Sequence, residues 1–133
     1  MAPTCGYALA MEHNGDVYSC DHFVEPKHKL GNIREKMLVE MVTSKQQQAF
    51  GRAKRDSLPR ACRGCKVRFA CNGQCPKNRF GPSDRRQPGL NILCEGYKAF
   101  FAHIDPAMQF MAAAIRARRP PSDIMALLAQ ETG

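Results

Sequence analysis

The stretch CRGCKVRFACNGQC, residues 62–75, places four cysteines within fourteen residues. The wider segment 57–94 holds five of the seven cysteines, several glycines and prolines, and no clear period of apolar residues. A hydrophobic core does not order a segment of this composition, whereas metal binding supplies free energy that can. The chemistry of the thiols therefore decides how this part of the chain folds.

Thiols this close together suit disulfides, zinc ligation, redox catalysis or iron–sulfur ligation. The N-terminus lacks a basic stretch followed by a long apolar one, so we expect a cytoplasmic chain without a secretory signal. Structural disulfides are rare in that reducing compartment. Seven cysteines also leave at least one outside any complete set of intrachain bridges. A disulfide scaffold is therefore disfavoured.

The cysteine spacing favours iron–sulfur clusters and leaves zinc as an alternative. Cys62 and Cys65 form a C-x2-C pair, which can hold either kind of centre from a tight turn. The pattern continues as C-x5-C-x3-C, so a second C-x2-C pair is missing. The one H-x5-H pair, His22 and His28, precedes the cysteine-rich segment instead of following its C-x2-C pair. Ligands that are all thiolate and unevenly spaced suit the soft coordination of iron–sulfur clusters.

The chain is basic, with a formal net charge of +8. That charge is compatible with a nucleic-acid or acidic-protein partner, but it falls to about +5 if seven thiolates hold two clusters whose cores carry +2 each. Near the cysteines lie Lys54, Arg55, Arg60, Arg63, Lys66 and Arg68. Only Phe69 accompanies them as a stacking platform for bases. We expect them to offset thiolate charge, and a zinc module contacting nucleic acid is the alternative.

Working outward from the cysteine-rich segment, residues 5–24 read as a β-hairpin. Asn14-Gly15 favours a two-residue type I′ turn, in which both central residues have positive φ. Apolar residues alternate on either side of this turn, which is the pattern of paired strands. Cys5 and Cys20 would then lie near the open ends of adjacent strands.

The rest of the chain reads mainly as helices. Asn32 with Glu35 three residues later is typical of a capping box, so a helix is expected from Asn32. A second helix is expected over residues 43–56, and Asp105-Pro106 should interrupt a later one.

The predicted fold class is α+β. It has a small β-hairpin, helices, and a cysteine-rich loop region organised by two [4Fe–4S] clusters. The predicted division is an iron–sulfur domain over residues 1–100 and a C-terminal helical extension over 101–133 packed on it. No apolar run approaches the roughly 18 residues that span a membrane, so no membrane partner is expected.

The full pattern, C-x9-G-x4-C, then C-x2-C-x5-C-x3-C, then C, resembles the seven-cysteine signature of the SPASM domain. That domain carries auxiliary [4Fe–4S] clusters in radical-SAM peptide-modifying enzymes. The stretch EHNGDVYSCDHFVEPKHKLGNI, residues 12–33, further resembles the anaerobic sulfatase-maturating enzymes. These enzymes oxidise a cysteine or serine of a sulfatase to Cα-formylglycine.

The resemblance implies two interleaved clusters, each with its own thiolates. One cluster would be held completely by Cys62, Cys65, Cys71 and Cys94. Three irons of the other would be held by Cys5, Cys20 and Cys75. In the family, the fourth ligand of the cluster held by Cys5, Cys20 and Cys75 lies upstream of the first cysteine. Residues 1–4 of this sequence contain no cysteine.

The resemblance also implies a catalytic residue and partners. Asp21 would be the base that deprotonates the substrate's thiol or hydroxyl group, which a carboxylate can do if burial raises its pKa. The partners would be a sulfatase polypeptide, a radical-SAM domain in cis or in trans, and an electron acceptor such as ferredoxin or flavodoxin. The C-x3-C-x2-C motif of the S-adenosylmethionine-cleaving cluster is absent from this sequence, so the chain alone is not expected to be active.

Overall fold

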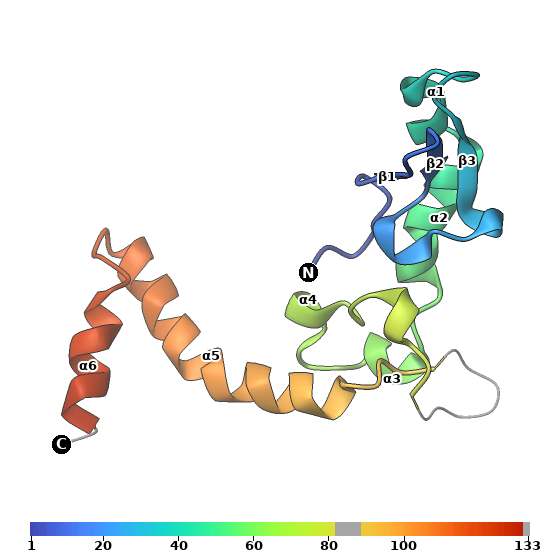
Figure 1. Ribbon diagram of the computed structural model, residues 1–133. Coiled ribbons are helices and arrows are strands. Elements are labelled where there is room, and N and C mark those ends of the chain that lie inside the picture. The colour runs from blue at the N-terminus through green and yellow to red at the C-terminus, as the bar shows by residue number, and fades with distance from the viewer. Residues whose placement is uncertain (82–88, 132–133) are drawn as a thin grey trace. The chain divides into compact units, whose positions relative to one another are not determined.

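The computed structural model describes residues 1–81 and 89–131, which form two compact units, Met1–Leu93 and Cys94–Gly133. The first unit contains a small antiparallel sheet in the order β1-β2-β3 together with short helices (Figure 1). Its strands are β1 Ala10–Met11, β2 Asp16–Tyr18 and β3 Lys29–Asn32. Its helices are η1 Asp21–Phe23, η2 Pro26–His28, α1 Leu38–Val42, α2 Lys45–Asp56, α3 Arg60–Arg63, α4 Arg68–Cys71 and η3 Pro76–Asn78. The predicted α+β class is confirmed.

The predicted hairpin is present, but its turn differs from the expected one. Ala10 pairs with Tyr18, and Met11 pairs with Val17. The Gly15 amide donates to the Glu12 carbonyl at 2.9 Å, and only Gly15 in this loop has positive φ, at +88°. The connection is therefore a three-residue loop with glycine in the left-handed position, and the two-residue type I′ prediction was wrong.

The helix expected from Asn32 was also wrong, because this residue ends β3. Its side-chain amide donates to Asp16 Oδ1 at 2.9 Å and to the Asn14 carbonyl at 3.1 Å. Its Oδ1 accepts from the Arg34 amide at 3.0 Å. The side chain thus ties the third strand to the hairpin turn and stabilises a local turn after the strand. The helix begins only at Leu38.

The core of the first unit is small. Val17, Leu30 and Met41 form its buried apolar cluster, and Leu9 packs against them. Helix α2 confirms the prediction for residues 43–56 closely, and Ser44 caps it by accepting from the Gln47 amide at 3.1 Å. A small number of buried apolar side chains therefore orders the strands and α2. The cysteine-rich segment folds instead into short helices and turns.

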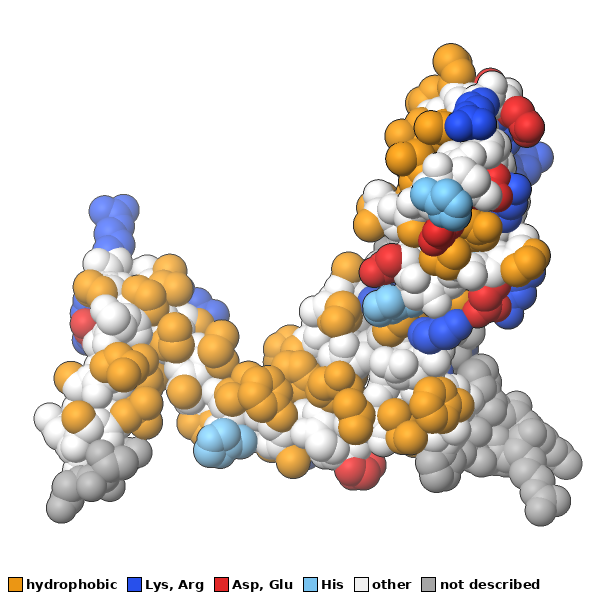
Figure 2. Space-filling view, viewed as in Figure 1, with side chains coloured by type: hydrophobic (Ala, Val, Ile, Leu, Met, Phe, Trp, Pro, Cys, Tyr) orange, Lys and Arg blue, Asp and Glu red, His pale blue; other side chains and the backbone are white. Residues whose placement is uncertain are grey.

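The second unit consists of two helices, α5 Cys94–Arg116 and α6 Asp123–Glu131, which pack together. Pro106 lies inside α5, so the predicted interruption at Asp105-Pro106 was wrong. A single interior proline removes one backbone hydrogen bond, and here the helix continues through it. Figure 2 shows apolar side chains along both helices. Among the described residues, no helix is long and apolar enough to cross a membrane.

Candidate metal centre

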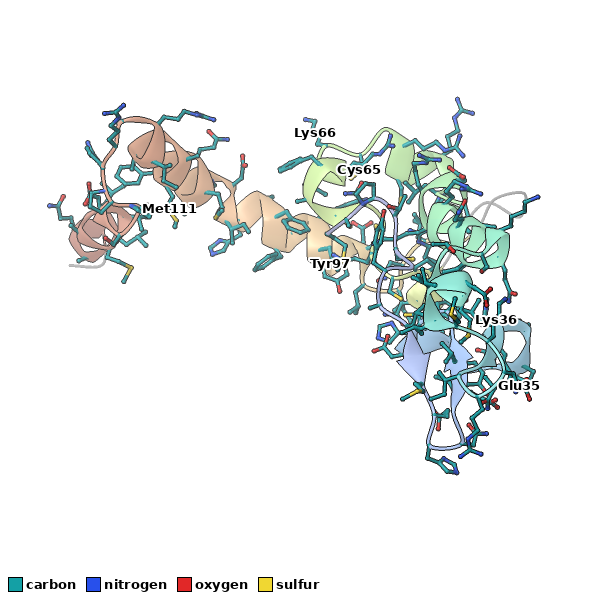
Figure 3. All side chains as sticks on the ribbon, turned by 90° about the horizontal axis from the view of Figure 1, so that it is seen from above. Glu35, Lys36, Cys65, Lys66, Tyr97 and Met111 are labelled. Atoms are coloured by element: carbon teal, nitrogen blue, oxygen red, sulfur yellow. The ribbon has the colours of Figure 1, made fainter. Side chains whose placement is uncertain are left out.

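Most cysteines of the first unit lie in or directly beside short helices, whereas Cys5 lies in the N-terminal stretch before β1. Cys20 directly precedes η1, and Cys75 directly precedes η3. Cys62 lies in α3 and Cys71 ends α4, whereas Cys65 lies in the turn between these helices (Figure 3). All seven cysteines lie within the described residues, are half-buried and form no disulfide. Thiols placed at element ends can converge while their backbones stay in separate segments.

Helix α2 holds the segments that carry Cys5 and Cys20. Gln47 is 2% exposed, and its Nε2 donates to the Gly6 carbonyl at 2.8 Å and to the Ser19 carbonyl at 3.0 Å. The Cys5 amide donates to the Gly51 carbonyl at 3.2 Å. One buried side chain therefore fixes the residue after Cys5 and the residue before Cys20.

Side-chain contacts bring Cys75 to the same place. Lys77, in η3, forms a 2.6 Å ion pair with Glu25 and lies 5.1 Å from the centre of the Phe23 ring. His22 Nδ1 lies 3.1 Å from the sulfur of Cys75. These contacts hold the start of η3 against the segment that follows Cys20.

The environment of the thiols agrees with this convergence. Burial raises the pKa of the Cys5 thiol, the Lys54 ammonium lowers it, and the charge of Cys75 raises it. Burial also raises the pKa of the Cys20 thiol, and the hydrogen bond to Asp21 and the charge of Cys75 raise it further. Together with the hydrogen bonds of Gln47 and the contact of His22 with Cys75, this brings together the three chain segments whose thiols the family resemblance assigned to one cluster.

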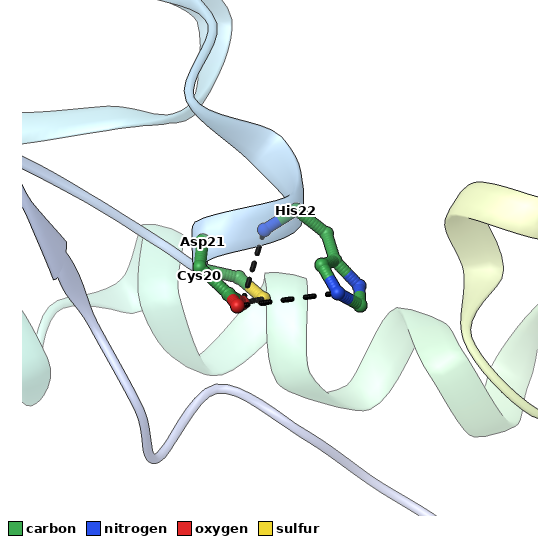
Figure 4. Close-up of side chains that lie close together, drawn as sticks. All are labelled: Cys20, Asp21 and His22. Atoms are coloured by element: carbon green, nitrogen blue, oxygen red, sulfur yellow. Dashed lines mark hydrogen bonds and ion pairs between the residues drawn. The ribbon is translucent and has the colours of Figure 1, made fainter.

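Cys20, Asp21 and His22 form a tight group in which one ligand atom from each lies within 4.8 Å of the others (Figure 4). Asp21 Oδ1 accepts from the Cys20 thiol and from the His22 amide, both at 3.0 Å. The Asp21 side chain is 77% exposed. The hydrogen bond from the Cys20 thiol lowers the pKa of Asp21, and the charge of His22 lowers it further. Burial acts in the opposite direction but is outweighed, so the pKa of Asp21 lies below its usual value.

The other predicted ligand set is divided between the two units. Cys62 and Cys71 both lie close enough to Arg79 for their charges to act on its guanidinium. Cys65 follows Cys62 in a turn closed by a 3.3 Å hydrogen bond from the Cys65 amide to the Cys62 carbonyl. Cys94 is the first residue of the second unit, and its assignment rests on the sequence alone.

Two basic residues lie within the site rather than on the surface. Lys54 is only 4% exposed and is close enough to Cys5 to lower that thiol's pKa. Arg79 is half-buried, and the charges of four cysteines act on it. The basic residues near the cysteines predicted a role for Lys54 but not for Arg79, which follows Cys75 by four positions. Its closeness to the cysteine-rich segment was the only signal in the sequence.

Comparisons with known proteins give the same domain. Residues 5–66 match the SPASM model, described as an iron–sulfur cluster-binding domain. The chain is 52% identical over 128 residues to a serine-type anaerobic sulfatase-maturating enzyme of Bacteroides thetaiotaomicron, which covers 96% of this chain and 31% of that protein. It is 31% identical over 108 residues to a cysteine-type enzyme of Clostridium perfringens, covering 81% of this chain and 29% of that protein.

Solved structures agree with the sequence relatives. Native anSMEcpe with bound AdoMet and the Cp18Cys peptide has a TM-score of 0.70 and 29% identity, over 85% of this chain and 31% of that one. Native anSMEcpe with bound AdoMet and the Kp18Cys peptide has a TM-score of 0.67 and 30% identity, over 80% of this chain and 29% of that one. The chain thus spans less than a third of the length of these relatives. Residues 5–66 thus belong to a SPASM domain, as the resemblance of the cysteine pattern predicted, and the chain is similar to the anaerobic sulfatase-maturating enzymes, as the resemblance of residues 12–33 predicted.

Proposed function

We propose that this chain is the auxiliary iron–sulfur part of an anaerobic sulfatase-maturating enzyme. The observation that carries the proposal is the convergence of the three segments that hold Cys5, Cys20 and Cys75. Gln47 binds the carbonyls of Gly6 and Ser19, and His22 Nδ1 lies 3.1 Å from the sulfur of Cys75. The donor set fits an iron–sulfur cluster, because it offers half-buried thiols and a buried cation, Lys54, that offsets thiolate charge.

The proposal includes two [4Fe–4S] clusters with interleaved ligands. Cys5, Cys20 and Cys75 would hold the first cluster. Residues 1–4 contain no cysteine, so the fourth ligand of this cluster would come from elsewhere. The second cluster would be held by Cys62, Cys65, Cys71 and Cys94. Cys71 and Cys75 are four positions apart and would serve different clusters, so one short loop would fix the distance between them.

When bound, the clusters would supply a path for the electron that the oxidation of the substrate releases. The chain's own residues would hold the clusters and shape the channel for the target peptide. The complete enzyme would act on a sulfatase polypeptide, with a radical-SAM domain that binds S-adenosylmethionine and with ferredoxin or flavodoxin as electron acceptor. The chain lacks C-x3-C-x2-C, so we expect no turnover without that domain.

The relatives favour a serine-type substrate. The 52% identical protein and a 39% identical one from Klebsiella pneumoniae are serine-type, whereas the cysteine-type enzyme of Clostridium perfringens is 31% identical. We expect the complete enzyme to convert serine in a sulfatase peptide, and paired serine and cysteine peptides would test this. Formylglycine from the cysteine peptide alone would overturn the serine assignment.

Asp21 is proposed as the base that removes a proton from the substrate's hydroxyl or thiol group. The test is Asp21→Asn in the complete enzyme, which preserves the shape of the side chain. Formylglycine formation should fall about 10²–10⁴-fold, which is the usual range for loss of a general base. The iron content should not change. Unaltered turnover would leave Asp21 only its hydrogen bonds to Cys20 and His22.

The decisive measurement is iron, zinc and acid-labile sulfide per chain after anaerobic reconstitution. About eight irons and eight sulfides would support two clusters, with the first completed by an outside ligand. About four of each would mean that only one site fills. Stoichiometric zinc without sulfide would overturn the proposal and favour a zinc-binding module that contacts nucleic acid.

A further inference from the structure

Arg79 is a half-buried cation that belongs to neither proposed ligand set. Its guanidinium and Nε donate hydrogen bonds only to neutral oxygens of the described residues. These acceptors are the carbonyls of Asn72 (3.3 Å), Gly73 (3.0 Å), Gln74 (3.3 Å) and Lys54 (2.9 Å), and Ser57 Oγ (3.2 Å). The side chain therefore connects the loop between Cys71 and Cys75 to the C-terminal end of α2.

The loop that Arg79 binds has an unusual backbone. Asn72, Gly73 and Gln74 are three consecutive residues with positive φ, at 45°, 68° and 53°. Residues other than glycine adopt this region at a cost and persist there only where the surroundings hold them. Arg79 donates to the carbonyls of all three residues. It supplements the backbone hydrogen bond from the Gln74 amide to the Cys71 carbonyl, at 2.9 Å.

The charge of Arg79 has no acidic partner among the described residues. The ion pairs found there join other groups. A buried charge without a counter-charge is costly. The ionisable groups whose charges act on Arg79 are Cys62, Cys75, Cys5 and Cys71. These four belong to both proposed ligand sets, and only as thiolates would they balance the guanidinium.

We propose that Arg79 is a positioning residue for both clusters, which fixes the loop between Cys71 and Cys75 and supplies one positive charge to both sets of thiolates. The inference rests on the proposed function. A nearby positive charge stabilises the more negative, reduced form of a cluster and so raises its reduction potential. Arg79 thus has two separable properties, its array of donors and its charge.

The experiment compares Arg79→Lys and Arg79→Gln with the unaltered chain after anaerobic reconstitution. Lysine keeps the charge but cannot reach several carbonyls in a fixed fork, and glutamine removes the charge. The readouts are iron and sulfide per chain, the EPR spectrum of the reduced clusters, and their midpoint potentials. Arg52→Gln is the control, because Arg52 is an exposed residue of α2 that donates to the Gln48 side-chain oxygen, at 3.5 Å, and is not one of the basic residues assigned to the thiolates.

We expect both Arg79 variants to retain less iron or to show altered EPR spectra, while Arg52→Gln does not. The midpoint potentials should fall in Arg79→Gln and stay near the original values in Arg79→Lys. If Arg79→Gln assembles no cluster while its helix content, measured by circular dichroism, is unchanged, the positioning role is supported. The midpoint potentials are then measured in Arg79→Lys alone. Unchanged iron and potentials in both variants would overturn the inference, as would equal shifts in Arg52→Gln. An unaltered chain that assembles no cluster would instead refute the proposed function.

Discussion

Gly73 shows how closely packed the loop between Cys71 and Cys75 is. It is buried and has φ of 68°, which is favourable only for glycine. A Cβ at this position would overlap the Leu58 side chain and lie 3.0 Å from Arg79 Nη2. Gly64 lies in the same segment with φ of −95°, and no atom lies within 4 Å of where its Cβ would be.

These two glycines make a matched pair of substitutions. Gly73→Ala should destabilise the chain by roughly 1–3 kcal/mol, the usual range for a residue forced into an unfavourable backbone region. It should also lower the iron retained per chain, because the loop fixes Cys71 and Cys75. Gly64→Ala should be neutral, or stabilising by about 0.4–1 kcal/mol. Denaturant unfolding and iron analysis would check both, and equal effects would contradict the close packing.

At the scale of elements, Gln47 is the side chain through which α2 controls the first ligand set. Gln47→Leu would leave the Gly6 and Ser19 carbonyls without their donor, which should cost about 1–3 kcal/mol in unfolding free energy. The iron at the Cys5 and Cys20 site should fall as well. Gln48→Leu is the control, since Gln48 is exposed and its Nε2 donates only to the Thr43 carbonyl. An identical loss in both variants would show that Gln47 has no special role.

The contact between Glu25 and Lys77 joins η3 to the segment after Cys20. Hydrogen bonds from Lys77 and Lys27 lower the pKa of Glu25 from 4.5 to about 2. A depressed carboxyl pKa stabilises the fold above pH 4.5, and this contribution is lost as the pH falls from 4.5 towards 2. Thermal unfolding of the iron-free chain should show this loss. Glu25→Gln should flatten the dependence in that range, and an unchanged slope would contradict the assignment.

Sequence patterns predicted the elements that depend on local signals. The hairpin follows from Asn14-Gly15 and the alternating apolar residues around it, and α2 agrees with the helix expected over residues 43–56. The assignment of the cysteines as ligands rests on the family resemblance and stays a prediction. Strand β3 was missed because Asn32 favours a helix start locally, and its side chain finds partners in the hairpin turn only after folding. Arg79 was missed because its partners are mostly backbone carbonyls, which every residue provides.

At the scale of the whole molecule, the chain contains two units with one proposed ligand, Cys94, at the start of the second. Cys94→Ser should reduce the iron content from about eight to about four per chain, because only one of the two clusters uses this thiolate. Cys20→Ser should also leave about four, but at the other site. EPR spectra of the two variants should therefore add up to that of the original chain. Two identical spectra would contradict the division of the ligands.

The convergence of Cys5, Cys20 and Cys75 has a consequence for how the clusters are assembled. Cys5 and Cys75 are about 70 residues apart, whereas Cys62 and Cys71 are about nine apart, and loop closure costs about (3/2)RT times the logarithm of the length. In an unfolded chain, bringing Cys5 to Cys75 costs about 2 kcal/mol more chain entropy than bringing Cys62 to Cys71, and about 0.7 kcal/mol more than bringing Cys62 to Cys94, which completes the other set. The thiols of the first cluster meet readily only once the sheet and α2 have formed, whereas Cys62, Cys65 and Cys71 are neighbours even in a chain that has just left the ribosome.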